Sequence, residues 1–214
     1  MKRKIVTKLM AIVLAGVLLT GSVTPGFHMS RVQAAEDLFN TRYDFNFEDG
    51  IEGWYYGEGW EYQYNGAKPT LESDTENGRM KIAVDFSQDA DKNWSNIAAC
   101  WKSEEGIDLS GVTQISMDIW YETEKLTEGE LKLAFYSNCG IDVNTSLIDV
   151  QEEEGTGLTK ARAVFGFPAI GSDAVTDLAV KIVGCNTGYS GAVWIDNIQF
   201  EAKDSETGDE SEQP

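Results

Sequence analysis

Aromatic side chains crowd one short stretch of the chain. Between Trp54 and Tyr64, six of the eleven residues are aromatic, and glycine, glutamate and glutamine separate them. Sugars are recognised by such a mixture, because their apolar C–H faces stack on aromatic rings while their hydroxyls bond nearby carboxylates and amides. Tyr55 and Trp60, which have glycine and glutamate close by, are expected to be exposed. Trp54 is expected in the core, and Tyr62 stays open between the core and the surface.

Trp94 is the second feature that points to a ligand. It lies in the polar segment 87–95, in which no other large apolar residue occurs. An indole exposed there wastes apolar surface unless a ligand covers it, so we predict a ligand contact. Trp101 differs, because it shares one side of its segment with Ile97 and Ala99 and is expected in the core.

Trp120 is a further candidate ring, because its segment alternates between two faces. In residues 115–121, isoleucine, methionine and isoleucine take one side, while serine, aspartate and Trp120 take the other. The first side supplies a core, and the second is available as a binding surface. We therefore include Trp120 among the candidate ligand-binding residues, and the placement of Trp194 stays open.

The elements that must position these rings are short strands. Segments of β-favouring residues recur between turns such as Asn65-Gly66 and Asn77-Gly78. This spacing predicts an all-β fold, a sandwich or a barrel, with no amphipathic helix longer than two turns. The predicted strands are 42–48, 59–64, 79–86, 95–102, 113–121, 130–137, 159–166, 174–183 and 192–200.

The balance of charge excludes several partners. The 214 residues include 36 acidic and 17 basic side chains, which gives a net charge of −19. A phosphate backbone is held by clustered cations, so we expect no nucleic acid partner. Anionic membrane surfaces are disfavoured for the same reason.

Both ends of the chain have compositions that differ from the middle. Residues 1–35 combine a basic start, an apolar run from Leu9 to Leu19 and small residues before the expected cleavage after Ala34 or Ala35. These are the parts of a signal peptide, and the run is too short to span a bilayer. Residues 203–214 are acidic and polar, as in a disordered tail or linker. We therefore predict a secreted protein with one domain over residues 36–202.

Histidine and cysteine usage limits the chemistry further. The only histidine, His28, would leave with the signal peptide, which excludes Ser-His-Asp and Cys-His sites and histidine-bound zinc. The spacing of Cys100, Cys139 and Cys185 fits no metal motif, and three cysteines form at most one disulfide. Cys100 and Cys185 are interpreted most simply as small buried apolar residues.

Several short motifs, in their order along the chain, resemble a known family. They are the Phe-Asn-Phe-Glu-Asp-Gly of 45–50 followed by Gly53-Trp54, the Leu-Ser-Gly of 109–111, and the Gly-Ala-Val-Trp-Ile-Asp-Asn-Ile of 191–198. Together with the positions of Trp60 and Trp94, they make the chain similar to the mannan-binding carbohydrate-binding modules of families 27 and 23, over roughly residues 42–201. The resemblance implies a β-sandwich of the jelly-roll type, built from two antiparallel sheets.

The resemblance also implies residue roles. The positions that match the family's sugar platform are Tyr55, Trp60 and Trp94. One departure is the segment 138–141, Asn-Cys-Gly-Ile, where a further platform tryptophan is expected after the strand 131–136. A missing ring weakens the case for mannan more than the case for β-glycans in general.

A structural Ca²⁺ that joins the first and last strands is a second implication of the resemblance. The matching carboxylates are Glu48 and Asp196, with a backbone carbonyl near Asn46. Carboxylate and carbonyl oxygens are the ligands that this hard cation prefers. Without the resemblance, Glu48 and Asp196 would be interpreted as ordinary turn residues.

The sequence therefore predicts a monomeric, non-catalytic module that binds β-mannan or a related polysaccharide by aromatic stacking. It could be one part of a larger glycoside hydrolase such as a mannanase. The first alternative is a jelly-roll glycoside hydrolase acting on β-glycans. The segment 118–122 resembles the Glu-x-Asp-x-x-Glu strand of laminarinase-like enzymes, which carries their catalytic carboxylates. Against this alternative, Ser116 occupies the position of the first glutamate. The second alternative is a structural cell-surface module, which would not need exposed rings.

Overall fold

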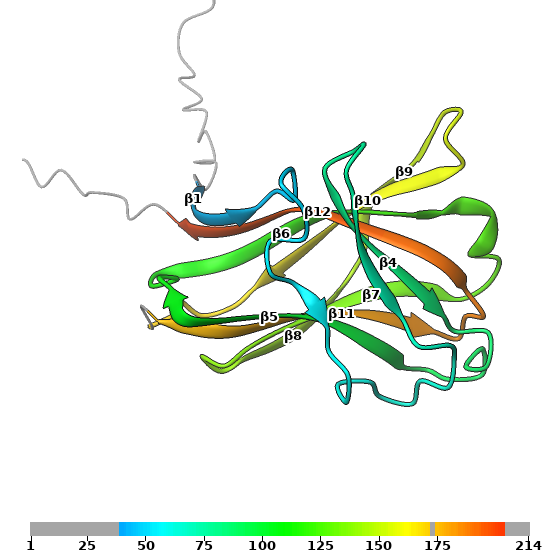
Figure 1. Ribbon diagram of the computed structural model, residues 1–214, viewed down its shortest axis with the longest axis horizontal. Coiled ribbons are helices and arrows are strands. Elements are labelled where there is room, and N and C mark those ends of the chain that lie inside the picture. The colour runs from blue at the N-terminus through cyan, green and yellow to red at the C-terminus, as the bar shows by residue number, and fades with distance from the viewer. Residues whose placement is uncertain (1–38, 172–173, 204–214) are drawn as a thin grey trace, which may run out of the picture. The chain divides into compact units, whose positions relative to one another are not determined.

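Two antiparallel β-sheets pack face to face in this protein (Figure 1). The computed structural model describes residues 39–171 and 174–203. The predicted signal peptide and residues 204–214 of the predicted acidic tail lie outside the described residues, while Lys203, the first residue of that tail, belongs to the last strand of the fold. Within these ranges the helical content is one 3₁₀ turn, η1 (Thr123–Lys125), and no helix is long and apolar enough to cross a bilayer. The predicted β-sandwich is confirmed.

The larger sheet has seven strands, and its last strand, β12, is the longest. The strand β1 pairs with the C-terminal half of β12, where Phe45 lies opposite Ile198. The remaining order across the sheet is β3-β4-β12-β6-β10-β9. The bounds are β1 (Phe39–Phe45), β3 (Thr70–Asp74), β4 (Arg79–Asp85), β6 (Val112–Glu122), β9 (Ile148–Glu153), β10 (Leu158–Gly166) and β12 (Ser190–Lys203).

The smaller sheet has five strands in the order β2-β5-β11-β7-β8. Its central strands β5, β11 and β7 are long and apolar, while the edge strand β2 has two residues. The bounds are β2 (Tyr55–Tyr56), β5 (Ser95–Ile107), β7 (Glu130–Ser137), β8 (Ile141–Ser146) and β11 (Val175–Cys185).

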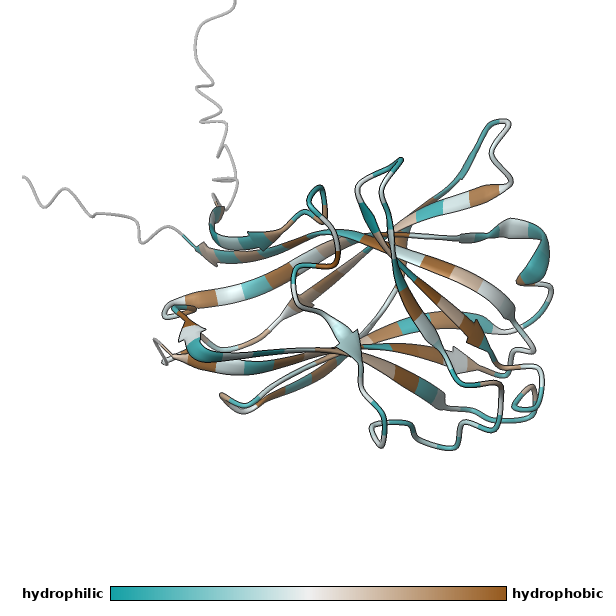
Figure 2. Cartoon of the chain, viewed as in Figure 1, coloured by the Kyte–Doolittle hydropathy of each residue, from teal (hydrophilic) through white to brown (hydrophobic). Residues whose placement is uncertain are grey.

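The core lies between the sheets and follows the alternation of each strand (Figure 2). In β4, Met80, Ile82 and Val84 are buried while the residues between them are partly exposed, as expected for a strand with one face in the core. Trp54 and Trp101 are buried in this core, as predicted.

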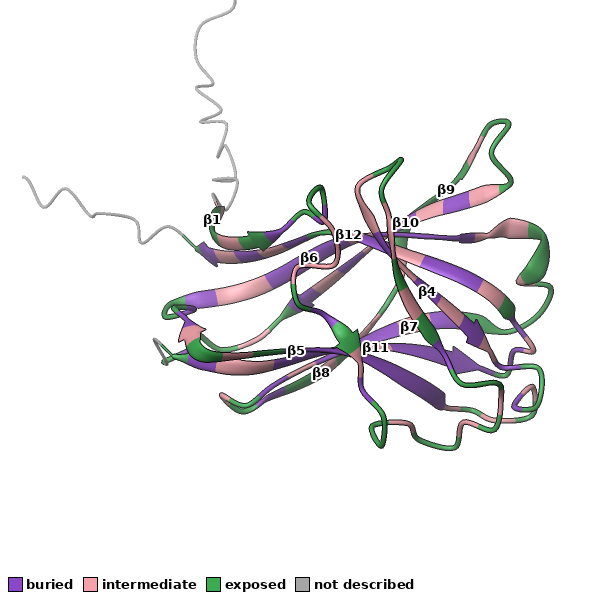
Figure 3. Ribbon diagram, in the orientation of Figure 1, coloured by how far each residue is buried: buried purple, intermediate pink, exposed green. Residues whose placement is uncertain are grey.

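The smaller sheet departs from this pattern, because parts of its central strands are buried on both faces (Figure 3). Residues 95–101 of β5 are all buried, and so are residues 182–185 of β11. An antiparallel sheet on the outside of a sandwich normally exposes one face to water. Side chains from elsewhere in the chain must therefore cover the outer face of this sheet.

Four strands and one loop differ from the sequence-based prediction. The strands β2, β3, β8 and β9 were not predicted, whereas the predicted strand 59–64 is a loop that touches β5 through a single bridge between Tyr62 and Asn96. Aromatic and polar residues alternate in the segment 59–64, as they do in a half-buried strand. However, Gly59 and Gln63 have positive φ angles of 89° and 52°. Such angles interrupt an extended chain.

Candidate functional site

One row of side chains crosses the outer face of the five-stranded sheet from edge to edge. Paired residues on neighbouring antiparallel strands point to the same face, so the strand register defines the row. Its members, in strand order, are Tyr55, Cys100, Ala179, Tyr136 and Asp142. The next row consists of Ala98, Lys181, Ala134 and Asn144. The small residues of the two rows, which are Cys100, Ala179, Ala98 and Ala134, leave room for rings to lie on the sheet.

Trp60 and Tyr136 form an aromatic pair on this face. Their ring centroids are 5.0 Å apart and the rings meet edge to face, at an interplanar angle of 67°. Tyr136 comes from β7 and lies against Ala98, Cys100 and Ala179. Trp60 comes from the loop after β2 and remains 40% exposed. The pair therefore offers a supported but accessible aromatic surface.

Trp94 lies on the same face, next to the first pair. Its indole is half-buried and packs on Ala134, Val183 and Cys185 of β7 and β11. The apolar partners absent from its own loop are thus supplied by distant strands. Ala134 and Tyr136 are two residues apart in β7, so the supports of the two tryptophans are separated by about 7 Å, on the scale of one sugar unit.

Lys181 brings a positive charge beside the Trp60–Tyr136 pair. Its Nζ lies 5.9 Å from the Trp60 ring centroid and 6.0 Å from that of Tyr136, and 3.9 Å from Oδ1 of Asp142. The lysine side chain is 19% exposed. It can therefore donate hydrogen bonds to hydroxyls of a ligand that stacks on the rings.

The two loops that carry the tryptophans are joined by a buried carboxylate. Asp89 is 1% exposed and accepts hydrogen bonds from the backbone N–H of Asn65 at 3.0 Å, from its Nδ2 at 2.6 Å and from the Ser95 hydroxyl at 3.1 Å. At Gly57, a Cβ atom would lie 2.4 Å from Sγ of Cys100, so only glycine lets this loop approach the sheet so closely. These contacts hold Trp60 and Trp94 in fixed places before any ligand arrives.

Comparison with known proteins identifies the family. The model of carbohydrate binding module 27 matches residues 32–203. The chain belongs to carbohydrate-binding module family 27. The resemblance to family 27 stated from the sequence is confirmed, whereas no curated protein matches the chain significantly.

Two solved structures share the fold of this family 27 module. One is TmCBM27, a carbohydrate-binding module described for specific mannan recognition; it has 17% identity, covers 78% of this chain and 99% of its own, and has a TM-score of 0.59. The other, a family 28 module specific for non-crystalline cellulose, has 16% identity, coverage of 73% and 92%, and a TM-score of 0.55. Both are too distant in sequence to transfer a ligand.

The structure brings together three of the four predicted ring residues. Tyr55, Trp60 and Trp94 share the outer face of the five-stranded sheet, and Tyr55 is 47% exposed at its edge. Tyr62, for which the core was one alternative, is 55% exposed and lies in the loop between β2 and β3, which also carries Trp60. Tyr136 was missed, although the alternation of β7 places it opposite Phe135 and thus away from the core.

Trp120 lies elsewhere in this family 27 module. It belongs to β6 of the seven-stranded sheet and is 3% exposed. The Arg79 guanidinium lies 3.6 Å from its ring centroid and Nζ of Lys160 lies 4.8 Å away, while its indole N–H donates to Glu153 at 2.9 Å. Covered by cations, the indole of Trp120 offers no face on which a sugar could stack, which corrects the prediction.

The residues predicted to bind Ca²⁺ lie on, or directly after, the paired strands β1 and β12. Phe45 of β1 lies opposite Ile198 of the antiparallel strand β12. The chain that follows Phe45, which carries Asn46 and Glu48, therefore runs toward the position of Asp196. Burial raises the pKa of the Asp196 carboxyl, which accepts hydrogen bonds from the Asn197 backbone and side chain. Residues 39–171 and 174–203 hold no group of three or more His, Cys, Asp or Glu side chains arranged for a metal. Backbone carbonyls would have to complete any site at Glu48 and Asp196.

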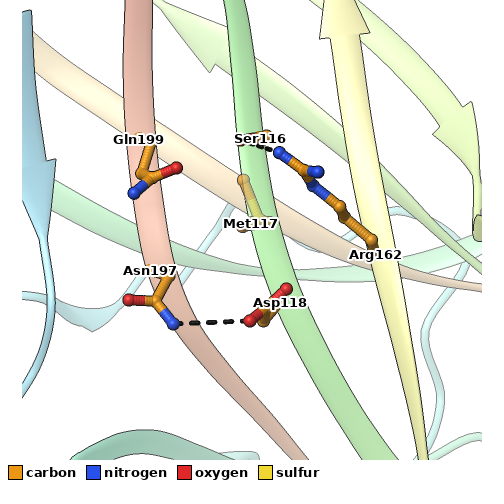
Figure 4. A pocket seen from close by; sticks show the side chains of 6 residues that line it. All are labelled: Ser116, Met117, Asp118, Arg162, Asn197 and Gln199. Carbon is orange, nitrogen blue, oxygen red and sulfur yellow. Dashed lines mark hydrogen bonds between the residues drawn. The ribbon is translucent and has the colours of Figure 1, made fainter. Parts of the chain in front are cut away.

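The carboxylates weighed as catalytic groups are engaged in other contacts. Asp118 forms an ion pair with Lys160 at 3.0 Å and accepts from Asn197 at 3.4 Å, in a polar pocket with Ser116 and Arg162 (Figure 4). Glu122 accepts from Lys125 at 2.7 Å. Because Ser116 replaces the first glutamate and donates to Glu201, this strand presents no pair of free carboxylates facing one another.

Proposed function

We propose that this family 27 module binds soluble β-mannan on the outer face of the five-stranded sheet. The observation that carries the proposal is the surface formed by Trp60, Tyr136 and Trp94, with Lys181 beside the first two rings. Stacked rings hold the C–H faces of consecutive sugars, and the lysine and Asp142 bond hydroxyls. Each aromatic contact is worth about 1 kcal/mol, so several together give a useful affinity.

Mannan and cellulose differ in the orientation of the 2-hydroxyl of each sugar, and this surface can distinguish the two orientations. The 2-hydroxyl of mannose is axial and projects from the face of the sugar ring, whereas that of glucose lies in its plane. Lys181 lies beside the Trp60–Tyr136 pair, about equally far from both rings, and is placed to bond a projecting hydroxyl. This favours mannan, while the fold shared with the cellulose-binding family 28 module makes a β-glucan the second candidate.

Secretion and the monomeric state are parts of the same proposal. The basic and then apolar start of the chain supports export. A polysaccharide outside the cell is the ligand that such a protein would meet. The surface formed by Trp60, Tyr136 and Trp94 is built from one chain and needs no partner subunit to complete it.

Binding without turnover is the expected result with purified protein. Affinity electrophoresis in gels that contain galactomannan, glucomannan, xylan or mixed-linkage β-glucan should show the strongest retardation with the mannans. No reducing sugar should be released from any of them, since the module has no free carboxylate pair on β6. Retardation by none of the four polysaccharides would refute the proposed function, and reducing-sugar release would establish an enzyme instead.

We also propose that Glu48 and Asp196 hold Ca²⁺ together with a carbonyl near Asn46. An ion that binds only the folded state adds about 2.7 kcal/mol when present at a hundred times its dissociation constant. Chelation should then lower the melting temperature by about 5–10 °C. Retardation in mannan gels below the melting transition should change little.

The control for the ion is the variant Asp196→Ala. It should melt at the temperature of the chelated protein and should not respond to further chelation. An unchanged melting curve after exhaustive chelation of the unmodified protein would show that no stabilising ion is bound.

A further inference from the structure

A second recess lies on the seven-stranded sheet, on the opposite side of the sandwich from Trp60 and Trp94. It has a volume of about 550 Å³, which falls within the range of small-molecule sites. Its walls come from the end of β6, the turn η1, the start of β10 and the middle of β12. The side chains that line it are Glu122, Glu124, Lys125, Thr156, Leu158 and Trp194.

Trp194 provides the aromatic wall of this recess. It pairs with Trp120 on one side and with Lys81 on the other, so its ring lies on the outer face of the sheet. Two cations cover the indole of Trp120, and its N–H donates to Glu153. The side chain of Trp194 is partly exposed and has no ring, cation or hydrogen-bond partner within residues 39–171 and 174–203. Its indole face and its N–H are therefore both available to a ligand.

Glu122 provides a carboxylate that is already held in place. Its Oε2 accepts from the Ala192 N–H at 2.9 Å and from Lys125 Nζ at 2.7 Å. A Cβ atom at Gly191 would lie 2.4 Å from this oxygen, so the Glu122 carboxylate rests directly on β12 at this glycine. Although burial favours the neutral acid, Lys125 and the Ala192 N–H lower the pKa of Glu122, which keeps it charged at neutral pH.

We infer that this recess is a second carbohydrate site, which takes one or two units of a neutral oligosaccharide. The Trp194 indole and the partly exposed Leu158 would contact the C–H face of a sugar, while Glu122, Lys125 and Thr156 would bond its hydroxyls. Uronic acids are disfavoured, because Glu122 and Glu124 lie at the site and the whole chain has a net charge of −19. The inference goes beyond the proposed function and shares no residue with the mannan surface.

The test uses the indole N–H resonances of the six tryptophans in ¹⁵N-labelled protein. Mannohexaose, cellohexaose and xylohexaose are titrated separately into a Trp60→Ala/Trp94→Ala variant, whose first surface is disabled. The Trp194 resonance, assigned by its loss in Trp194→Ala, should shift saturably with at least one sugar, with a dissociation constant on the order of 1 mM. No shift with any of the three up to about 20 mM would overturn the inference, and would leave the recess to a partner of another kind.

Two controls separate this inference from the proposed function. In the unmodified protein, mannohexaose should also move the Trp60 and Trp94 resonances; if it moves only that of Trp194, the proposed function fails and the second site stands. Glu122→Gln in the disabled variant should weaken binding at Trp194 about tenfold, because the charged acceptor is lost. A Trp194 shift that appears in the unmodified protein but vanishes in the disabled variant would be transmitted from the first surface and would overturn the inference.

Discussion

Replacing Trp94 with alanine is expected to remove most of the affinity for polysaccharide and leave the sandwich folded. A ring at the centre of a binding surface is often worth more than about 2 kcal/mol, which corresponds to a loss of about 30-fold in affinity. The indole packs on Ala134, Val183 and Cys185 from outside the sheet and is not part of the main core. Calorimetric titration with galactomannan measures the loss, and thermal unfolding by circular dichroism measures the fold.

The matched control is Val150→Ala, which removes an exposed apolar side chain from β9 of the other sheet. Its affinity should equal that of the unmodified protein. If Trp94→Ala lowers the melting temperature as much as a core variant does, Trp94 is a structural residue. Affinity that is retained in a folded Trp94→Ala protein would instead support the structural cell-surface module.

Replacing Trp101 with alanine is expected to have the opposite outcome, a large loss of stability. The side chain is 8% exposed, its ring centroid lies 5.6 Å from that of Phe45, and it belongs to the main core. Truncating a buried tryptophan costs about 3–5 kcal/mol, because contacts are lost and a cavity remains. Urea unfolding measures the change in the free energy of unfolding.

The affinity of folded Trp101→Ala protein for galactomannan should stay within a few-fold of normal at low temperature. Its ring lies on the core face of β5, whereas the sugar surface lies on the other face. A free energy loss below about 1 kcal/mol would mean that Trp101 is not the core residue described here.

The rings of the binding surface could be found from the sequence to different degrees. Trp60 stands between glycine and glutamate residues and Trp94 stands in a polar segment, so local sequence was enough to single them out. The alternation of β7 is enough to place Tyr136 on the outer face, whereas the resemblance predicted a tryptophan in the segment after that strand. The ring is present two residues earlier than the departure at 138–141 suggested.

Trp120 shows where the sequence alone fails. Its outward direction was predicted from alternation, yet Arg79 of β4 and Lys160 of β10 cover the ring. Both cations are about forty residues away along the chain, and only the pairing of strands brings them over the indole. Asp89 is a similar case, because its hydrogen bonds to Asn65 depend on two loops meeting.

The strands that were missed are edge strands or lie next to an edge. β8 lies at one edge of the five-stranded sheet and β9 at one edge of the seven-stranded sheet, and every residue of β9 is at least partly exposed. Without a buried face there is no apolar alternation to detect. The long central strands of both sheets were predicted because they carry that alternation.

The central claim is that polysaccharide binds to the outer face of the five-stranded sheet through Trp60, Tyr136 and Trp94. Affinity electrophoresis of the unmodified protein beside Trp60→Ala/Trp94→Ala, in gels with and without galactomannan, tests it most directly. We predict that galactomannan retards the unmodified protein strongly, and that the double variant, with an unchanged melting temperature, migrates nearly as it does without polysaccharide. Equal retardation of both proteins would contradict the account, because the binding surface would then lie elsewhere.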